Sequence, residues 1–222
     1  MKLNINRIFI LFFFVFISFF HLTAEPELPL NSSQYKPDQV LKNVIKICNQ
    51  FHIPEKDNIL TAKQINENKA LYKVVDAFFD ADYMIAEAFK DQLPKMSSTQ
   101  KEKVNNLIKE LIRLIAYPLI KTFYKSIEYR INDTVIEGDQ AFVEIWHRKA
   151  EIDIEFNSYY FFIKKGDIWQ IRNFAYKLKV HDFISKYRRL FNKNIDAKGL
   201  SELIKTLEKE YQKKLAALTK GK

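Results

Sequence analysis

The spacing of apolar residues changes twice along this chain, and this limits the fold more than any other feature. Over residues 37–123, apolar side chains recur every three or four positions, as on one face of a helix. Over residues 127–180 they recur at every second position, as in half-buried strands, and from Phe183 the helical spacing returns. Helices followed by an antiparallel meander predict an α+β fold. We expect N-terminal helices packed on a curved antiparallel sheet of four to five strands, closed by two C-terminal helices.

Residues 1–24 are predicted to be a signal peptide. Lys2 and Arg7 precede an apolar run over residues 8–20, and cleavage is expected after Ala24. The run is shorter than the ~20 residues of a membrane-spanning helix, so a cleaved signal is favoured over an uncleaved anchor. We therefore expect the protein to be exported.

The exported part is predicted to form one domain. Residues 25–36 are expected to form an extended leader, and residues 37–222 a single α+β domain. Cys48 is the only cysteine, so the core alone must stabilise the fold. Without Lys2 and Arg7 the formal charge falls from +9 to +7. Such a surface fits anionic lipid headgroups or an acidic protein, or serves solubility alone, and export excludes an ordinary nucleic-acid partner.

Several residues are predicted to begin helices. Asp80 is placed to cap a helix that follows it. Ser97 and Gln100 have the spacing of a capping box, in which each side chain satisfies a free backbone N–H at the helix start. Thr99 and Glu102 offer the same motif two residues later, so either pair could begin the long helix.

The long helix has apolar residues on more than one face between Leu111 and Phe123. An apolar stripe of this width must be covered on several sides. Pro118 should kink the helix or end its regular hydrogen bonding near Leu114. Two interpretations remain: a central core helix bent over a curved sheet, or a helix that lines an internal apolar cavity.

Turns at Gly138 and Gly166 divide the strand region. A strand over residues 152–156 is predicted from the alternation of apolar and acidic residues, and an aromatic strand over residues 159–163 follows. The last strand is predicted to begin at Ile168 and to continue to Val180.

Two further expectations concern particular residues of the C-terminal half. Phe142 and Trp146 make the second face of their strand apolar, so both faces of this strand are expected to be covered. A break between the last two helices is predicted at residues 192–198, with Ser201 capping the final helix.

Sequence motifs for catalysis or metal binding are absent. The chain has no Gly-rich phosphate loop, no Gly-x-Ser-x-Gly elbow and no His-x-x-x-His pair. Cys48 and His52 share a helix face, but no second pair has ligand spacing, so a packed thiol near a surface imidazole is expected. Asp80 and Asp82 are expected to cap the helix that begins there and to be solvated, rather than to form a catalytic acid–base pair. No catalytic residue, metal or cofactor is therefore predicted.

The C-terminal region contains an ordered succession of motifs: Trp169 at a strand start, Tyr187-Arg188, Phe191, and Gly199-x-Ser201-x-Leu203-Ile204-x-x-Leu207. This order resembles the toluene-tolerance (MlaC-like) family, the soluble periplasmic phospholipid carriers of Gram-negative envelopes. The chain departs from the family pattern in between. Asn173 replaces an Asp near the strand, and two extra residues separate Trp169 from Tyr187.

The central helices resemble the same family, whose pattern there is Asp-x-x-x-Met, a Ser/Thr-x-x-Gln helix start and a late Tyr. The residues in those places are Asp80, Met84, Phe89-Lys90, Ser97, Gln100 and Tyr117. Lys90 replaces a Gly of the family pattern, and Leu93 replaces an aromatic residue. The resemblance therefore covers most of the chain after the signal.

The resemblance implies a periplasmic phospholipid carrier whose internal apolar cavity holds the acyl chains, with lysines near the headgroup phosphate. It implies a shuttle between an outer-membrane lipoprotein and porin complex and an inner-membrane ABC transporter complex with its lipid-binding hexamer. The phospholipid would be cargo rather than a cofactor. Candidate lipid-binding residues are Val75, Phe78, Phe79, Tyr83, Met84, Phe89, Leu107, Leu111, Ile115, Phe123, Phe142 and Trp146.

Two other functions remain open. A cone-shaped domain of the nuclear-transport-factor type would bind a small ligand or act as a hydrolase, with His147 in a cavity against a carboxylate such as Glu144 or Glu155. An exported binding module with an ordinary packed core would contain no cavity large enough for acyl chains.

Overall fold

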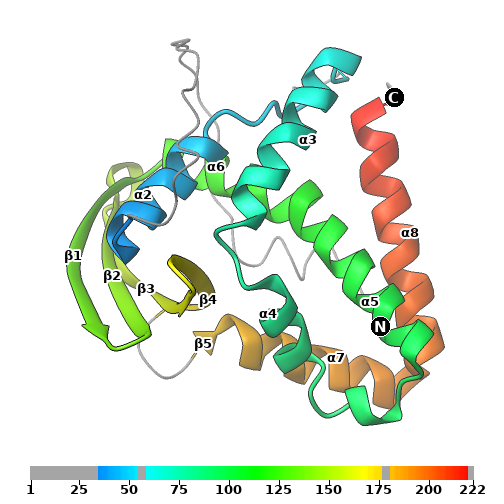
Figure 1. Ribbon diagram of the computed structural model, residues 1–222. Coiled ribbons are helices and arrows are strands. Elements are labelled where there is room, and N and C mark those ends of the chain that lie inside the picture. The colour runs from blue at the N-terminus through cyan, green and yellow to red at the C-terminus, as the bar shows by residue number, and fades with distance from the viewer. Residues whose placement is uncertain (1–34, 55–58, 177–180, 220–222) are drawn as a thin grey trace.

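The computed structural model describes residues 35–54, 59–176 and 181–219. The predicted signal peptide, all but the end of the predicted leader, and Val180 of the predicted last strand lie outside these ranges. Helices and one antiparallel sheet make up the described chain, which confirms the predicted α+β class (Figure 1).

The helices before the sheet are α2 (Pro37–Cys48), α3 (Ala62–Asp76), α4 (Ala81–Ala88), η2 (Leu93–Lys95), α5 (Ser98–Leu111), η3 (Ile112–Ala116) and α6 (Tyr117–Lys125). Two of them, α4 and α5, begin where the predicted capping residues place them. The side chain of Asp80 accepts a hydrogen bond from the Tyr83 N–H at 3.4 Å and caps α4, as predicted. Ser97 and Gln100 form the capping box of α5, so the alternative start at Thr99 is not used.

The long helix is interrupted next to Pro118. The π-helical segment η3 separates α5 from α6, and Pro118 lies in the first turn of α6. Proline lacks the N–H that would bond to the carbonyl of Leu114, four residues earlier, so regular α-helical bonding cannot pass this point. The predicted interruption is confirmed.

The sheet is an antiparallel meander in which strands adjacent in sequence are neighbours in space. Its strands are β1 (Glu128–Glu137), β2 (Gln140–Lys149), β3 (Ile154–Lys165), β4 (Ile168–Tyr176) and the two-residue β5 (His181–Asp182). Gly138 and Gly166 lie in the β1–β2 and β3–β4 turns at φ +59°, a left-handed conformation that glycine adopts without a steric penalty. Five strands lie within the predicted range.

The predicted separate strand over residues 152–156 is wrong. The chain turns there through η4 (Ala150–Ile152) and through Asp153, which has φ 48°. β3 then begins at Ile154 and runs without a break through the predicted aromatic strand. Ile152 and Ile154 are 47% and 50% exposed, so their alternation with acidic residues marks a turn and a strand end rather than a buried face.

The C-terminal helices α7 (Phe183–Lys198) and α8 (Leu200–Thr219) meet at Gly199. The predicted break at residues 192–198 is wrong, because α7 continues to Lys198 and ends where Gly199 adopts φ +82°. Ser201 lies inside the first turn of α8 and is not its cap. Within the described ranges, none of the helices is both long and apolar enough to cross a membrane.

Two apolar clusters form the interior. The sheet-side cluster, which includes Phe51 and Phe78, packs α2, α3 and α6 against the inner face of the sheet. The helical cluster, which includes Phe89 and Phe191, joins α4, α5, α7 and α8. Ile112 of η3 packs against both clusters. In Figure 1 the curved sheet and α2 lie on one side of the molecule, and α8 lies on the other.

The strand β2 has one buried face and one half-exposed face. Val143 and His147 point to the interior and are 0% exposed, whereas Phe142 and Trp146 point outward and are half-buried. The guanidinium of Arg130 lies 4.6 Å from the centroid of the Trp146 ring. The prediction that both faces of this strand are covered is therefore wrong for the outer face, where side chains of the sheet itself give partial cover.

Candidate functional site

The segment between α3 and α4 ties the helices to the sheet. The Ile171 N–H donates to the Phe78 carbonyl at 2.8 Å, and the Asp80 N–H donates to the Ile171 carbonyl at 2.9 Å. The amide of Gln170 donates to the Ala77 carbonyl at 2.9 Å. The segment thus forms a parallel bridge with β4, and this bridge fixes the position at which α4 begins.

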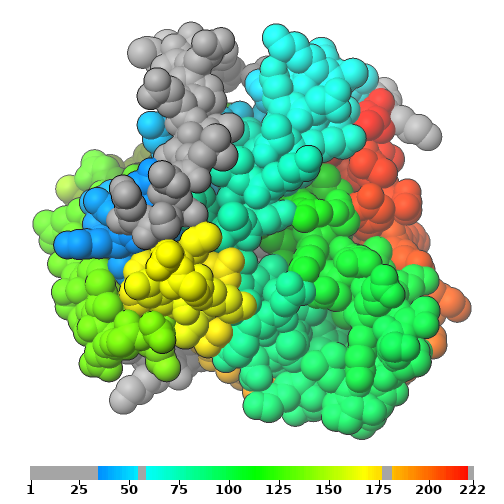
Figure 2. Space-filling view, viewed as in Figure 1, coloured from blue at the N-terminus to red at the C-terminus, as the bar shows by residue number. Residues whose placement is uncertain are grey.

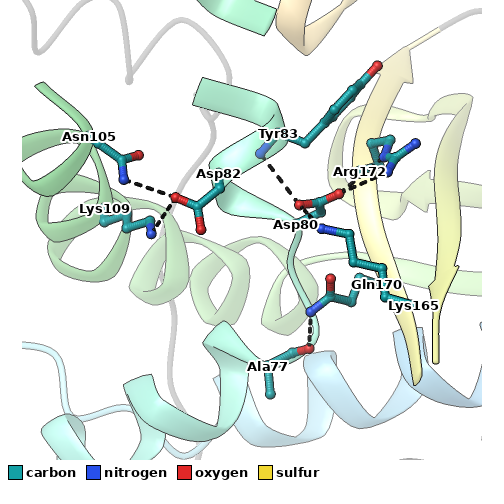
Figure 3. Close-up of polar contacts among 9 residues, drawn as sticks. All are labelled: Ala77, Asp80, Asp82, Tyr83, Asn105, Lys109, Lys165, Gln170 and Arg172. Atoms are coloured by element: carbon teal, nitrogen blue, oxygen red, sulfur yellow. Dashed lines mark hydrogen bonds and ion pairs between the residues drawn. The ribbon is translucent and has the colours of Figure 1, made fainter. Parts of the chain in front are cut away.

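The carboxylate of Asp80 is buried and neutralised by two cations from the sheet. Its side chain is 2% exposed, with Lys165 Nζ at 2.7 Å and Arg172 Nη2 at 3.1 Å (Figure 3). The guanidinium of Arg172 also lies 4.1 Å from the centroid of the Tyr83 ring. A carboxylate at this depth needs such partners, because an unpaired buried charge costs several kcal/mol. The prediction that Asp80 caps α4 is confirmed, and the prediction that it is solvated is wrong.

Asp82 points in a different direction, toward α5 (Figure 3). Lys109 Nζ lies 2.6 Å from its carboxylate, and Asn105 donates a hydrogen bond at 2.9 Å. The hydrogen bond from Lys109 is the main cause that lowers the pKa of Asp82 below its usual value. The Asp82 side chain is 71% exposed, so its ion pair with Lys109 adds at most about 1 kcal/mol to stability.

A pocket of about 370 Å³ opens where α3, α4, α5, η3 and α6 meet the β3–β4 hairpin. Charged side chains of both signs surround it, and its apolar residues include Phe79, Ile112 and Tyr117. The lining also contains Ala81 and Gln170. Figure 2 shows the face on which the cyan α3, the teal α4 and the yellow end of the β3–β4 hairpin meet. The pocket lining therefore combines charged groups of both signs with a few apolar side chains.

A third ion pair, between Arg113 and Asp76, also lines the pocket. Arg113 Nη2 lies 2.5 Å from the Asp76 carboxylate, and Arg113 also contacts Glu110. The Tyr117 hydroxyl donates to Asp76 at 2.8 Å, and burial is the main cause that raises the pKa of Tyr117 well above its usual value. Each cation of the pocket lining is thus paired with a carboxylate, and the pairs at Asp76 and Asp80 have additional partners.

The structure does not bring the predicted lipid-binding residues together into one lining. Four belong to or pack against the sheet-side cluster: Val75, Phe78, Phe79 and Phe123. Four belong to or pack against the helical cluster: Phe89, Leu107, Leu111 and Ile115. Met84 is buried on α4, Tyr83 is partly exposed beneath Arg172, and Phe142 and Trp146 lie on the outer face of the sheet. Only Phe79 lines the pocket described above.

Leu107 lies instead in a second, shallower pocket of about 440 Å³ between α5 and α8. Its lining residues are Thr99, Glu102, Lys103, Asn106, Leu107, Glu110 and Tyr211. It shares no lining residue with the pocket at Asp80 and is therefore a separate pocket.

Sequence reasoning missed most of the pocket. Lys109, Arg113 and Lys165 carry no motif, and they come from different elements that only the fold brings together. Asp80 and Asp82 were the one available indication, because two carboxylates at a helix start are conspicuous in the sequence. Their cationic partners lie up to 92 positions away and have no sequence pattern of their own.

His147 is buried without a carboxylate among its hydrogen-bond partners in the described chain. Its Nε2 lies 2.7 Å from the Ser158 hydroxyl, and its ring stacks on Phe156 at 4.8 Å. Burial lowers the pKa of His147 to about 4. The geometry required for a hydrolase of the nuclear-transport-factor type, a histidine in a cavity against Glu144 or Glu155, is not found. Glu144 contacts Asn157 and Tyr159 instead.

The thiol of Cys48 is buried, and burial raises its pKa. His52 pairs with Glu67 at 2.7 Å. In the described ranges, no group of three or more His, Cys, Asp or Glu side chains is arranged to hold a metal ion.

A scan of protein-family models and a search of curated proteins found no match to this chain. Among solved structures, the chain is similar to the phospholipid-binding protein from Ralstonia solanacearum, solved in complex with a phospholipid. The TM-score is 0.57 at 11% sequence identity, and the match covers 80% of this chain and 96% of the other. The two proteins therefore share a fold over nearly the whole length of the Ralstonia chain.

Proposed function

We propose that the protein binds a phospholipid, with the headgroup in the pocket at Asp80 and Asp82 and the acyl chains against the apolar residues beneath. The observation that carries this proposal is the pocket itself, whose lining combines charged groups of both signs with Phe79, Ile112 and Tyr117. The fold shared with a protein that was solved with a bound phospholipid supports the same class of ligand.

Binding the acyl chains requires the interior to open. A diacyl phospholipid in water exposes roughly thirty CH₂ groups, and each costs about 0.8 kcal/mol. A carrier must therefore bury apolar surface whose exposure to water costs on the order of 20 kcal/mol. The pocket of about 370 Å³ is lined by only four apolar side chains, those of Phe79, Ala81, Ile112 and Tyr117, which are too few to shelter two acyl chains. We therefore propose that the chains enter between the two apolar clusters.

The position of η3 supports opening along this boundary. Phe79 packs against the sheet-side cluster, Tyr117 belongs to it, and Ile112 contacts both clusters. Ile112 is also the first residue of η3, where regular α-helical bonding is interrupted. Single-turn π-helical segments are frequent at functional sites. Movement of α5 relative to α6 at η3 would separate the two clusters at Ile112, which also lines the pocket.

Export and transport extend the proposal beyond lipid binding. The N-terminal sequence, with its basic start and apolar run, supports export to the periplasm. There the protein would carry phospholipid between an inner-membrane ABC transporter complex with its lipid-binding hexamer and an outer-membrane lipoprotein and porin complex. In this role it would bind and release its ligand without a catalytic step.

Lipid extraction tests the proposal. Protein purified after export should release a stoichiometric amount of phospholipid into organic solvent, measured by mass spectrometry, and should take up fluorescent phospholipid from vesicles. Ile112→Asn, in the lining of the pocket at Asp80, should reduce uptake, whereas Leu107→Asn, a similar change in the second pocket, should not. Lipid-free protein that also fails to take up labelled phospholipid would overturn the proposal.

A further inference from the structure

We propose that the pocket at Asp80 and Asp82 selects a zwitterionic headgroup, one that carries both a phosphate and an ammonium, over a headgroup with net negative charge. The inference rests on the proposed phospholipid binding and specifies the lipid class that the same pocket takes.

The formal charges of the pocket lining balance. Three carboxylates, those of Asp76, Asp80 and Asp82, face three cations, those of Lys109, Arg113 and Lys165. A site built for anionic ligands would carry positive charge in excess, because complementary potential is what attracts a charged partner and rejects the wrong one. Balanced charges fit a ligand that itself carries both signs.

The three pairs differ in how easily a ligand can enter them. The Asp80 carboxylate is 2% exposed and held by two cations. Asp76 is held by Arg113 and by the Tyr117 hydroxyl. Asp82 is 71% exposed and has one cation, Lys109, which is 28% exposed. The Lys109–Asp82 pair is therefore the one that a headgroup can open.

A zwitterionic headgroup can replace both halves of this pair. Its phosphate accepts from Lys109 Nζ while its ammonium donates to the Asp82 carboxylate, so each protein charge keeps an opposite charge beside it. An anionic headgroup that takes Lys109 leaves Asp82 next to a second negative group and without its cation. Selectivity then comes from this repulsion as well as from the new attraction.

Calorimetric titration with two short-chain lipids tests the inference. Wild-type protein should bind dihexanoyl phosphatidylethanolamine about fivefold more tightly than dihexanoyl phosphatidylglycerol, as one added surface ion pair would give. Asp82→Asn should bring the two affinities to within about twofold of each other, since the carboxylate that distinguishes them is gone. Asp196→Asn, an exposed aspartate on α7 outside the pocket, should keep the wild-type ratio.

The outcomes separate this inference from the proposal beneath it. Equal binding of both lipids by the wild-type protein, or an unchanged ratio in Asp82→Asn, would overturn the headgroup preference and leave phospholipid binding intact. Failure of both lipids to bind would overturn the proposed function itself. Free phosphoethanolamine that binds as tightly as the lipid would show that the pocket takes a small soluble zwitterion, which would overturn the lipid as its source.

Discussion

The carboxylate of Asp80 lies 3.1 Å from the guanidinium of Arg172, and this pair joins the start of α4 to β4. Lys165 reaches the same carboxylate from the end of β3. The contact stands directly beside the pocket and continues the backbone bonds between this segment and Ile171. Asp80 is thus a residue that positions the helices relative to the sheet.

Asp80→Asn should lower the free energy of unfolding by about 2 kcal/mol, because Lys165 and Arg172 lose the buried carboxylate with which they pair, while the amide oxygen still accepts the helix-cap hydrogen bond. Asp80→Ala should cost about 1 kcal/mol more, because the cap is lost as well. Urea unfolding of both variants measures these losses. Asp82→Asn should cost less than about 1 kcal/mol, and equal losses in the two Asn variants would contradict the role assigned to Asp80.

The start of α5 can be tested by comparing its two possible capping residues. Ser97→Ala should lower the free energy of unfolding by about 1 kcal/mol, because the Ser97 hydroxyl accepts the Gln100 N–H at 3.2 Å. Thr99→Ala lies within the first turn and should change it by less than about 0.5 kcal/mol. A larger loss for Thr99→Ala in urea unfolding would place the cap two residues later.

His147 should make stability depend on pH. Its pKa in the folded protein is about 4, below the ordinary value of 6.5, because burial disfavours the charged ring. Between these values only the unfolded chain binds the proton, so stability is full above about pH 6.5 and falls as the pH drops toward 4. The loss should total about 3 kcal/mol.

The measurement is the free energy of unfolding across this pH range, wild type against variant. The double variant His147→Leu, Ser158→Ala removes the titrating ring together with the hydroxyl it contacts, so no buried partner is left unpaired. Its pH slope should be shallower by the amount given above. An unchanged slope in the double variant would refute the assignment.

Phe89 and Phe142 test which of the predicted lipid-binding residues are structural. The rings of Phe89 and Phe191 lie 4.3 Å apart between centroids in the helical cluster, so Phe89→Ala should lower the free energy of unfolding by about 3–5 kcal/mol. Phe142→Ala, on the half-exposed outer face, should cost about 1 kcal/mol. Thermal or urea unfolding distinguishes the two, and similar losses would contradict the two-faced description of β2.

Local features were predictable from the sequence, and assembled ones were not. The caps at Asp80 and Ser97 and the interruption at Pro118 depend on residues within one turn, so their chemistry is visible in the chain. The sequence did not predict that α7 continues past residue 192, because residues 192–198 are mostly polar. In the structure, the side-chain amide of Asn194 donates a hydrogen bond to the Leu190 carbonyl within the helix, and the polar composition does not reveal this contact.

The candidate site was the least predictable part. The predicted lipid-binding residues are apolar, whereas the pocket is lined mainly by charged side chains from α3, α4, α5, η3 and the end of β3, together with Asp80. In the sequence, Lys109 and Lys165 cannot be told apart from other surface lysines, and only the fold places them beside Asp82 and Asp80. Hydrophobic periodicity cannot predict contacts between residues of different elements, because it describes one helix or strand at a time.

The central claim is that acyl chains enter the interior between the two apolar clusters, and the chain's two tryptophans report on it directly. Trp169 belongs to the sheet-side cluster, and Trp146 lies on the outer face of the sheet. Trp146→Phe leaves only the inner reporter, and Trp169→Phe leaves only the outer one. Fluorescence is then measured with bound phospholipid whose acyl chains carry bromine, a contact quencher. The account predicts quenching in Trp146→Phe and not in Trp169→Phe; quenching of the outer tryptophan alone, or of neither, with lipid bound would contradict it.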